Sequence, residues 1–227
     1  MKVIQIHPWN VTYHEAIEIQ ERLRHQLKFE KVSRKIRYVA GTDVSFSKKT
    51  GMAWGGVVVL NFPDLSKVEE KWVREKVKFP YISGLLSFRE VPVLLSAMDR
   101  LEVYPDLILC DGQGNAHPRG IGLASHLGLM LDAPTIGCAK NRLVGEFSKV
   151  GPEKGNYTFL WYKGQLVGAV IRTRRRVRPI FVSQGNKITL DESVNMVLTC
   201  CQKYRIPEPI REAHLLVTRL RKGEGDG

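Results

Sequence analysis

The sequence lacks the marks of several large protein classes. It has no run of about 18 apolar residues, so we expect no segment to cross a membrane. It does not begin with a signal-peptide pattern, and we expect a soluble, cytoplasmic protein. It contains no GxxxxGK[ST] loop, which argues against a nucleotide-hydrolysing protein of the P-loop class.

Cysteine is scarce as well. The chain has 4 cysteines in 227 residues, with no CxxC pair and no histidines at the spacing of a zinc site. Cys110 and Cys138 lie in apolar, strand-like runs. We therefore expect buried free thiols, as in a reducing compartment, and neither a zinc module nor a disulfide framework.

Acidic residues are the minority charge. The 23 Asp and Glu face 35 Lys and Arg, which gives a net charge of +12. Such an excess favours a polyanionic partner, because basic side chains gain affinity by releasing phosphate counterions. A generally basic protein without such a partner is the alternative. The length fits one domain over residues 1–227, with a frayed tail at 221–227.

The order of predicted elements indicates the fold. Three strand-like segments joined by short turns (37–46, 52–62 and 68–79) are typical of an antiparallel meander, and the third alternates like an edge strand. A helix that ends near residue 101 follows. Strand, helix and strand then alternate (107–110, 120–131 and 134–137), which predicts parallel strands with crossovers. The chain closes with a hairpin, a strand and two helices: 157–161 with 166–172, 180–182, 191–204 and 209–220.

This is the order of the ribonuclease H-like fold. We predict an α/β protein with a mixed five-stranded central sheet, flanking helices, and extra C-terminal strands and helices. In that arrangement the first and fourth strands are neighbours. The acids at their ends, Asp43 and Asp111, should therefore converge.

Asp111 is the more telling of these two acids. It ends the apolar run 107–110 and is followed by Gly112 and Gly114, and α/β folds place ligand sites at the carboxyl ends of such strands. A carboxylate there is costly unless a cation meets it. Asp43 is the acid of the first strand; a surface aspartate is the other interpretation of that residue.

Glu90 and His214 are each open to two interpretations. Glu90 fits either a catalytic acid or the end of a helix-capping box that Ser87 begins. His214 lies on a helix with an apolar stripe, where a lone histidine is more often a core residue. Two or three carboxylates with one histidine are nevertheless what a Mg²⁺-dependent phosphodiester hydrolase needs, because Mg²⁺ prefers oxygen ligands.

Six segments together resemble the endonuclease V family. They occur in the family's order over nearly the whole chain: GTDVSF, PYISGLLSFRE, LILCDGQGNAHPRGIGLASHLG, CAKNRLVG, PIFVSQGN and YRIPEPIREAH. The resemblance implies a ribonuclease H-like nuclease of nucleic-acid repair. Such an enzyme cuts the second phosphodiester bond 3′ to a deaminated purine, above all deoxyinosine, and leaves 3′-hydroxyl and 5′-phosphate ends.

The resemblance also implies the partners of the protein. These are Mg²⁺ as the cofactor, with Mn²⁺ as a possible substitute, and DNA containing deoxyinosine, bound by a monomer. Two alternatives stay open. Inosine-containing RNA is one, because the contacts that distinguish RNA from DNA are not legible in the sequence. A nucleic-acid binder without catalysis is the other, although the intact acids argue against it.

The resemblance assigns catalytic roles to five residues. Asp43 and Asp111 would bind the metal, and Glu90, His214 and Lys140 would complete the catalytic set. Without the resemblance, Lys140 is an ordinary surface lysine.

Further residues would contact the nucleic acid. Tyr81 corresponds to a wedge that fills the gap left when a base leaves the stack; a tyrosine packed under its own loop is the alternative. Ser83 stands where the family usually has a second proline, so the wedge loop loses one fixed φ. The implied base pocket comprises Gly84, Leu86, Gly112 and Leu123. Weaker contacts are implied at Pro80, Ile82, His117 and Arg119.

The pocket would recognise hypoxanthine by its position-6 oxygen, which accepts a hydrogen bond where adenine has a donor amine. Backbone N–H groups would donate to that oxygen and leave the amine of adenine unpaired, at a cost of about 1–3 kcal/mol. Without the resemblance, Gly112 and Gly114 are simply tight-turn residues. The basic run 172–178 fits either a phosphate contact or a solvated strand edge.

Overall fold

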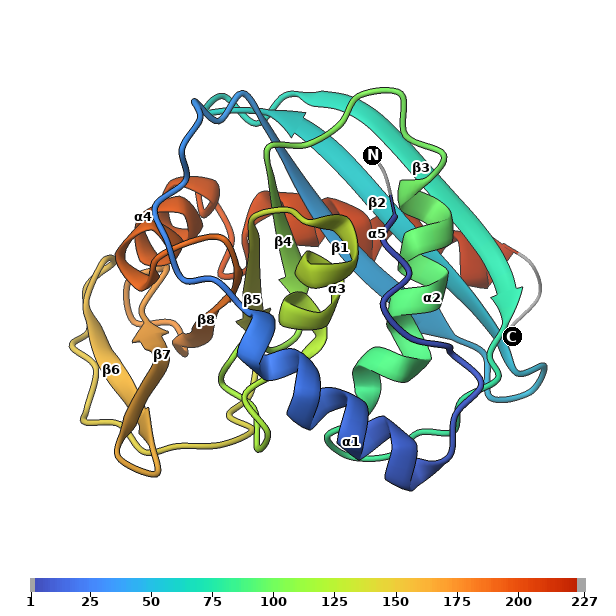
Figure 1. Cartoon of the computed structure of the whole chain (residues 1–227). Helices are drawn as coiled ribbons and strands as arrows, with labels where there is room; N and C mark the ends of the chain where they lie inside the picture. Colours follow the sequence, from blue (N-terminus) through green and yellow to red (C-terminus); the bar gives the residue numbers. More distant parts are fainter. Residues whose placement is uncertain (1–2, 224–227) are drawn as a thin grey trace.

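The structure, a computed structural model, describes residues 3–223 and is built on one sheet (Figure 1). Its eight strands run in the order β3-β2-β1-β4-β5-β8-β7-β6. The strands are β1 (Tyr38–Phe46), β2 (Met52–Asn61), β3 (Lys67–Lys76), β4 (Leu107–Asp111), β5 (Thr135–Ala139), β6 (Tyr157–Tyr162), β7 (Gln165–Ile171) and β8 (Ile180–Asn186). The helices are α1 (Tyr13–Leu23), the short 3₁₀ helix η1 (Arg24–Gln26), α2 (Leu86–Met98), α3 (Leu123–Leu131), α4 (Leu190–Cys200) and α5 (Glu208–Gly223).

Strands β1 to β5 form the predicted five-stranded core. The meander β1-β2-β3 is antiparallel, with β3 at the edge of the sheet, while β1, β4 and β5 run parallel. The extra C-terminal strands do not build a separate layer. Strand β8 pairs antiparallel with β5, and β7 and β6 continue the same sheet beyond it.

Helices cover both faces of the sheet, and the alternation along β1 shows why. Val39 packs into the core beneath α4 and α5, while its neighbour Ala40 packs into the core beneath α2 and α3. Successive side chains of a strand point to opposite faces, so a strand that is buried on both sides needs apolar residues at both parities. Helix α1 packs against the start of α2 through Ala16, Leu23 and Phe88.

Several predicted boundaries are corrected by the structure. Thr12 and Glu15 form a capping box at the start of α1. Of the two interpretations of Glu90, the capping box with Ser87 is wrong: α2 begins at Leu86, so Ser87 lies inside the helix and its hydroxyl is hydrogen-bonded to His126. The predicted tail is wrong over residues 221–223, which belong to α5, and residues 224–227 lie outside the described part.

The predictions about cysteines and membrane spans can also be compared with the structure. All four cysteines are free and buried, as predicted, and burial raises the pKa of the Cys110 thiol to about 12. Across residues 3–223, no helix combines the length and apolarity needed to cross a bilayer.

Candidate active site

The carboxyl ends of three neighbouring parallel strands carry the charged residues of the site. Asp43 lies in β1, Asp111 ends β4, and Lys140 directly follows β5. Thr42 pairs with Cys110, and Asp111 pairs with Cys138. The register of the sheet therefore brings these side chains to one edge, although the residues are far apart in the chain.

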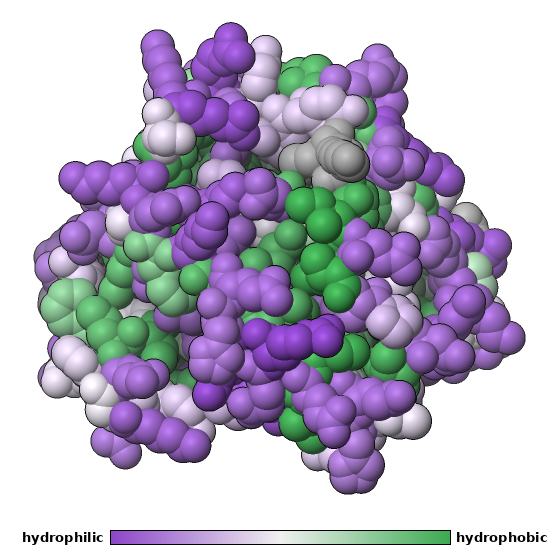
Figure 2. Space-filling model, in the orientation of Figure 1, coloured by the Kyte–Doolittle hydropathy of each residue, from purple (hydrophilic) through white to green (hydrophobic). Residues whose placement is uncertain are grey.

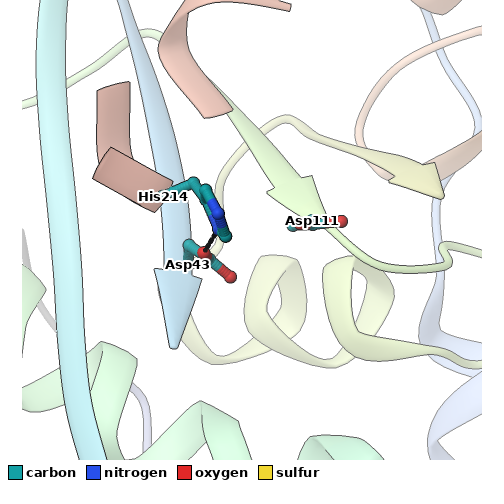
Figure 3. A group of neighbouring side chains, drawn as sticks. All are labelled: Asp43, Asp111 and His214. Carbon is teal, nitrogen blue, oxygen red and sulfur yellow. Dashed lines mark hydrogen bonds and ion pairs between the residues drawn. The ribbon is translucent and has the colours of Figure 1, made fainter. Parts of the chain in front are cut away.

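The predicted convergence of Asp43 and Asp111 is confirmed. One ligand atom from each of these carboxylates and one from His214 all lie within 4.8 Å of one another (Figure 3). Asp43 shares the face of β1 with Val39 and Gly41, and Asp111 shares the face of β4 with Leu109. Both carboxylates therefore point to the side of the sheet that α5 covers.

Helix α5 brings His214 to the carboxylates. The helix packs very close to β1: a Cβ added at Gly41 would lie 2.0 Å from the backbone of Pro209, so a larger residue would force the helix away. His214 is half-exposed and is not the core residue that its helical position also allowed. Its Nδ1 lies 2.7 Å from Asp43 Oδ2, a hydrogen bond that fixes the ring beside the carboxylate.

The site is rich in negative charge. Burial raises the pKa of Asp43, and the Asp111 carboxylate raises it further, against the lowering effect of His214. Burial raises the pKa of Glu90 well above its ordinary value, and Asp43 and Asp111 add to that rise. Glu90 comes from α2, and the two aspartates act on it electrostatically across the site.

Lys140 supplies one positive charge. Its Nζ donates to Asp111 Oδ2. Arg205, which the sequence reading did not identify, holds the lysine backbone by donating to its carbonyl at 3.0 Å. The same guanidinium donates to the carbonyls of Arg178 and Pro179, so it ties the loop after β5 to the segment before β8.

These residues fit a hard divalent cation. Asp43 and Asp111 offer carboxylate oxygens, the ligand type that Mg²⁺ and Mn²⁺ prefer. Glu90 interacts electrostatically with both aspartates but is not a member of the group whose ligand atoms lie within 4.8 Å of one another. Burial and the Asp111 carboxylate both disfavour the charged form of Asp43. A divalent cation bound between the two carboxylates would stabilise that charged form.

A hollow of about 390 Å³ opens beside the carboxylates. Asp111 and Lys140 form part of its wall, so the hollow and the charged cluster share residues. All four predicted pocket residues line it, together with three of the other predicted contacts: Gly84, Leu86, Gly112 and Leu123, then Tyr81, Ile82 and His117. The other two predicted contacts do not line the hollow: Pro80 is exposed, and Arg119 is hydrogen-bonded to the carbonyl of Gly84.

Tyr81 stands at the rim of this hollow with 73% of its surface exposed. It is therefore not packed under its own loop. The loop from Pro80 to Leu85 leads directly into α2, and Gly84 has φ +78°, a left-handed conformation that favours glycine. The structure thus places an aromatic ring on a short loop whose exit has one fixed conformation.

Three donors converge on the carbonyl of Gly84 and hold this loop. Gln20 Nε2 lies 3.1 Å from the oxygen, His117 Nε2 lies 3.0 Å from it, and Arg119 Nη2 lies 2.6 Å from it. Arg119 also donates to Gln20 Oε1 at 2.5 Å, and its backbone N–H donates to His117 Nδ1. We call these three side chains the Gly84 clamp. They bind the wedge loop to α1 and to the loop after β4.

Gln20 was not among the predicted residues, although its position in the sequence carries a signal. Gln20 occupies a buried position of α1 beside Ala16, Ile19 and Leu23, and only 1% of it is exposed. A buried amide needs partners, so a glutamine on the apolar stripe of a helix indicates a specific polar contact.

Part of the basic run 172–178 is structural. Arg172 donates to the carbonyls of Val150, Gly151 and Val177, so it ties the segment at residues 150–151 to the turn at residue 177. The arginines that remain exposed are Arg174, Arg175, Arg176 and Arg178.

Comparisons with known proteins show the family of the chain. The endonuclease V family model matches residues 18–215. An endonuclease V of Dehalococcoides mccartyi is 50% identical over 220 residues, which cover 97% of this chain and 99% of that protein. The chain belongs to the endonuclease V family.

Solved endonuclease V structures have the same fold. The crystal structure from Bacillus subtilis matches with a TM-score of 0.94 at 31% identity, covering 99% of this chain and 98% of that one. Ciona intestinalis endonuclease V, bound to a 23mer DNA containing an inosine followed by a ribo-adenosine, matches with a TM-score of 0.83 at 29% identity, covering 94% and 99%. The predicted family and the predicted ribonuclease H-like α/β fold are confirmed. As an endonuclease V, the chain is a phosphodiester hydrolase of the DNA-repair class, and endonuclease V enzymes depend on a metal.

Proposed function

We propose that this endonuclease V is a Mg²⁺-dependent DNA repair enzyme that recognises deoxyinosine. It hydrolyses the second phosphodiester bond 3′ to the lesion and leaves 3′-hydroxyl and 5′-phosphate ends. One observation carries the proposal: Asp111 belongs both to the group that could hold a metal and to the wall of the predicted base pocket. A base bound there would have its own strand next to the carboxylates.

Asp43 and Asp111 would hold the cation, and Glu90 would assist them. When bound, Mg²⁺ would act as a Lewis acid that stabilises the charge developing on the phosphate oxygens. Mn²⁺ has the same ligand preference and would substitute for it.

Two of the chain's own groups can act on the phosphate and its protons. The Lys140 ammonium, which pairs with Asp111, is positioned to attract a phosphate oxygen. The Nδ1–H of His214 donates to Asp43, so Nε2 of the same ring is left to accept a proton at the half-exposed side of the site.

The hydrogen-bond donors around the pocket would favour binding of hypoxanthine over adenine. Leu86 and Leu123 are the first residues of α2 and α3, so two helix N-termini border the hollow. The first N–H groups of a helix have no partner within it and carry partial positive charge. In α3 the N–H of Ala124 already donates to the Gln113 carbonyl, so the N–H groups of Leu86 and Leu123 would favour the acceptor oxygen of hypoxanthine and disfavour the donor amine of adenine. The N–H of Gly112 already donates to the carbonyls of Cys110 and Cys138, so Gly112 contributes surface and not this donor.

The test is cleavage of a labelled duplex that holds one inosine, mapped to the nucleotide, with Mg²⁺ or with EDTA. A duplex with adenine at the same position is the matched control. We expect one Mg²⁺-dependent cut at the second bond 3′ to inosine. A cut elsewhere, or equal cutting of the adenine duplex, contradicts the proposal.

Tyr81 would act as the wedge in this reaction. Tyr81→Ala should reduce cleavage of the inosine duplex by about five- to a hundredfold, since stacking of a base on an aromatic ring contributes about 1–3 kcal/mol. Cleavage of the same single strand should fall much less. Equal losses on duplex and single strand would rule out a wedge.

Inosine-containing RNA is a second candidate substrate. The observation that favours it is the ribo-adenosine that follows inosine in the DNA bound by the Ciona intestinalis enzyme. Cleavage rates on three matched single strands distinguish DNA from RNA as the main substrate. The strands are all DNA, all RNA, and DNA with one ribonucleotide after inosine. Faster cleavage of the ribonucleotide-containing strands would assign RNA as the main substrate.

A further inference from the structure

A second hollow lies beside the base pocket. It has a volume of about 550 Å³, a size typical of ligand sites. Its walls come from η1 and the residues after it, from the loop after β4, and from the β6–β7 hairpin. His117 lines both hollows and is only 4% exposed, so this buried ring stands between them.

The lining of this second hollow is basic and aromatic. Its basic side chains are Arg24, His25, His117 and Lys163, and none of its described lining residues is an aspartate or a glutamate. Arg24 also forms an exposed pair with Glu21, which lies outside the lining, at 3.6 Å. The net charge of +12 adds to this local excess. The surface therefore suits an anionic ligand.

The apolar part of the lining suits a flat ring. Phe29 is 46% exposed, and Leu166 is 39% exposed. The Lys163 ammonium lies 5.4 Å from the centre of the Tyr162 ring. Figure 2 shows hydrophobic surface gathered over the β6–β7 hairpin, with hydrophilic side chains around it. Lys163 and Gly164 both have positive φ, as in a tight two-residue hairpin turn, so the turn presents this lysine from a fixed position.

Asn115 gives an independent sign of a ligand. Its side chain lines the hollow, is only 8% exposed, and has an Oδ1 with no hydrogen-bond partner in the described protein. Its backbone is fixed, because its N–H donates to Gln184 and its carbonyl accepts from His117. Buried polar groups are almost always paired, so this unpaired amide oxygen beside the hollow is a candidate acceptor for a ligand or a water molecule.

We propose that this hollow binds an unpaired nucleotide of the strand whose lesion base occupies the first pocket. The base would stack on Phe29 and Tyr162, its phosphate would meet Arg24 and Lys163, and Asn115 would hydrogen-bond to the base edge or the sugar. Single strands are bound by this combination of cations and exposed aromatic rings. The proposal rests on the proposed function, because the first pocket must hold inosine.

Photo-crosslinking of the full chain tests the position of the nucleotide. Each probe is a single-stranded DNA with one inosine and one 5-iodouracil, and the position of the 5-iodouracil relative to inosine differs from probe to probe. The protein–DNA complexes are irradiated in the presence of EDTA, which prevents cleavage. We expect crosslinks to Tyr81 from positions next to inosine, and crosslinks to Phe29 or Tyr162 from one or two positions further along. Tyr81 crosslinks without any at Phe29 or Tyr162 would overturn this proposal alone. Absence of every inosine-dependent crosslink would overturn the proposed function as well.

Binding of the same strands to variants gives a second readout. Phe29→Ala should weaken binding of a long inosine strand about five- to a hundredfold. Lys163→Gln should lower the slope of log K against log salt by about 0.7. Lys35→Gln, an exposed lysine before the amino end of β1, is the matched control and should change neither quantity. Wild-type affinity and salt slope in both test variants would contradict the proposal.

Discussion

Two parts of the proposed active site are positioned by different physical means: the catalytic edge, which carries Asp43 and Asp111, and the wedge loop from Pro80 to Leu85. At the catalytic edge, Asp43 and Asp111 are carried by neighbouring strands whose ladder places them side by side. In the wedge loop, no strand or helix carries Tyr81, and the exit of the loop is held by three side chains on one carbonyl. The first arrangement is rigid because the sheet is rigid, whereas the second depends on a few buried hydrogen bonds.

The hydrogen bonds that hold the loop also explain why a serine can stand at position 83. A second proline would fix one φ of the loop from within, and this chain lacks it. The Gly84 clamp supplies restraint from outside the loop, through Gln20 of α1 and through His117 and Arg119 of the loop after β4. The missing proline therefore does not leave the wedge unsupported.

The largest effect should come from the catalytic edge. Asp43→Asn should reduce cleavage by roughly a hundredfold or more, since a metal contributes several kcal/mol of transition-state stabilisation. The melting temperature in EDTA should not fall, because burial and Asp111 already disfavour the charge on Asp43. Glu18→Gln, an exposed acid on α1, should change neither activity nor stability. Near-normal cleavage by Asp43→Asn would remove Asp43 from the metal site.

Loss of one donor of the Gly84 clamp should reduce the discrimination between inosine and adenine more than the rate of cleavage. Gln20→Leu keeps the volume but removes the donor to Gly84 and leaves buried partners unpaired, at a cost of about 1–3 kcal/mol of folding free energy. The ratio of inosine to adenine cleavage should fall by up to about a hundredfold, because small displacements of recognition groups have effects of that size. Gln202→Leu, at an exposed position after α4, is the control. Unchanged discrimination with reduced stability would show that Gln20 has only a structural role.

The clamp should weaken in acid. Burial, with a contribution from Arg119, lowers the pKa of His117 from 6.5 to about 4. Protonation thus opposes folding, and the stability present above about pH 6.5 is lost as the pH falls toward 4. His7 and His126 also have lowered pKa values, so the wild type must be compared with His117→Gln, which can still donate to Gly84. Between pH 7 and 4 the variant should lose less unfolding free energy, by up to about 3 kcal/mol. Identical pH profiles would contradict this role of His117.

The smallest effect should come from restoring the proline. Ser83→Pro should raise the free energy of unfolding by less than about 1 kcal/mol, through the entropy of the unfolded chain. Inosine discrimination should stay nearly unchanged because the clamp already holds the exit of the loop. In the Gln20→Leu background the same substitution should recover part of the lost discrimination. A large gain in the wild-type background would show that the clamp restrains the loop poorly.

The catalytic edge could be predicted from periodicity together with the order of elements. Alternation along residues 38–46 and the apolar run that ends at Asp111 placed each acid on a strand, and the ribonuclease H-like order made those two strands neighbours. The order of elements then predicted the fold. The sequence did not predict that the C-terminal strands extend the same sheet. Their place depends on which strand they pair with, and the periodicity of a strand does not identify its partner.

The clamp could not be predicted in the same way. Gln20 and Gly84 are 64 residues apart, and their contact depends on how α1 packs against the start of α2. The capping box at Ser87 failed for a similar reason. Its residues fit a local motif, but a long-range contact with His126 engages the hydroxyl instead.

Binding of Mn²⁺ to the full chain, measured by electron paramagnetic resonance, tests most directly whether Asp43 and Asp111 share a cation. We predict that the wild type and Glu18→Gln bind Mn²⁺ alike, and that Asp43→Asn and Asp111→Asn both lose this binding while remaining folded. If either aspartate variant bound Mn²⁺ as the wild type does, the two carboxylates would not form one metal site.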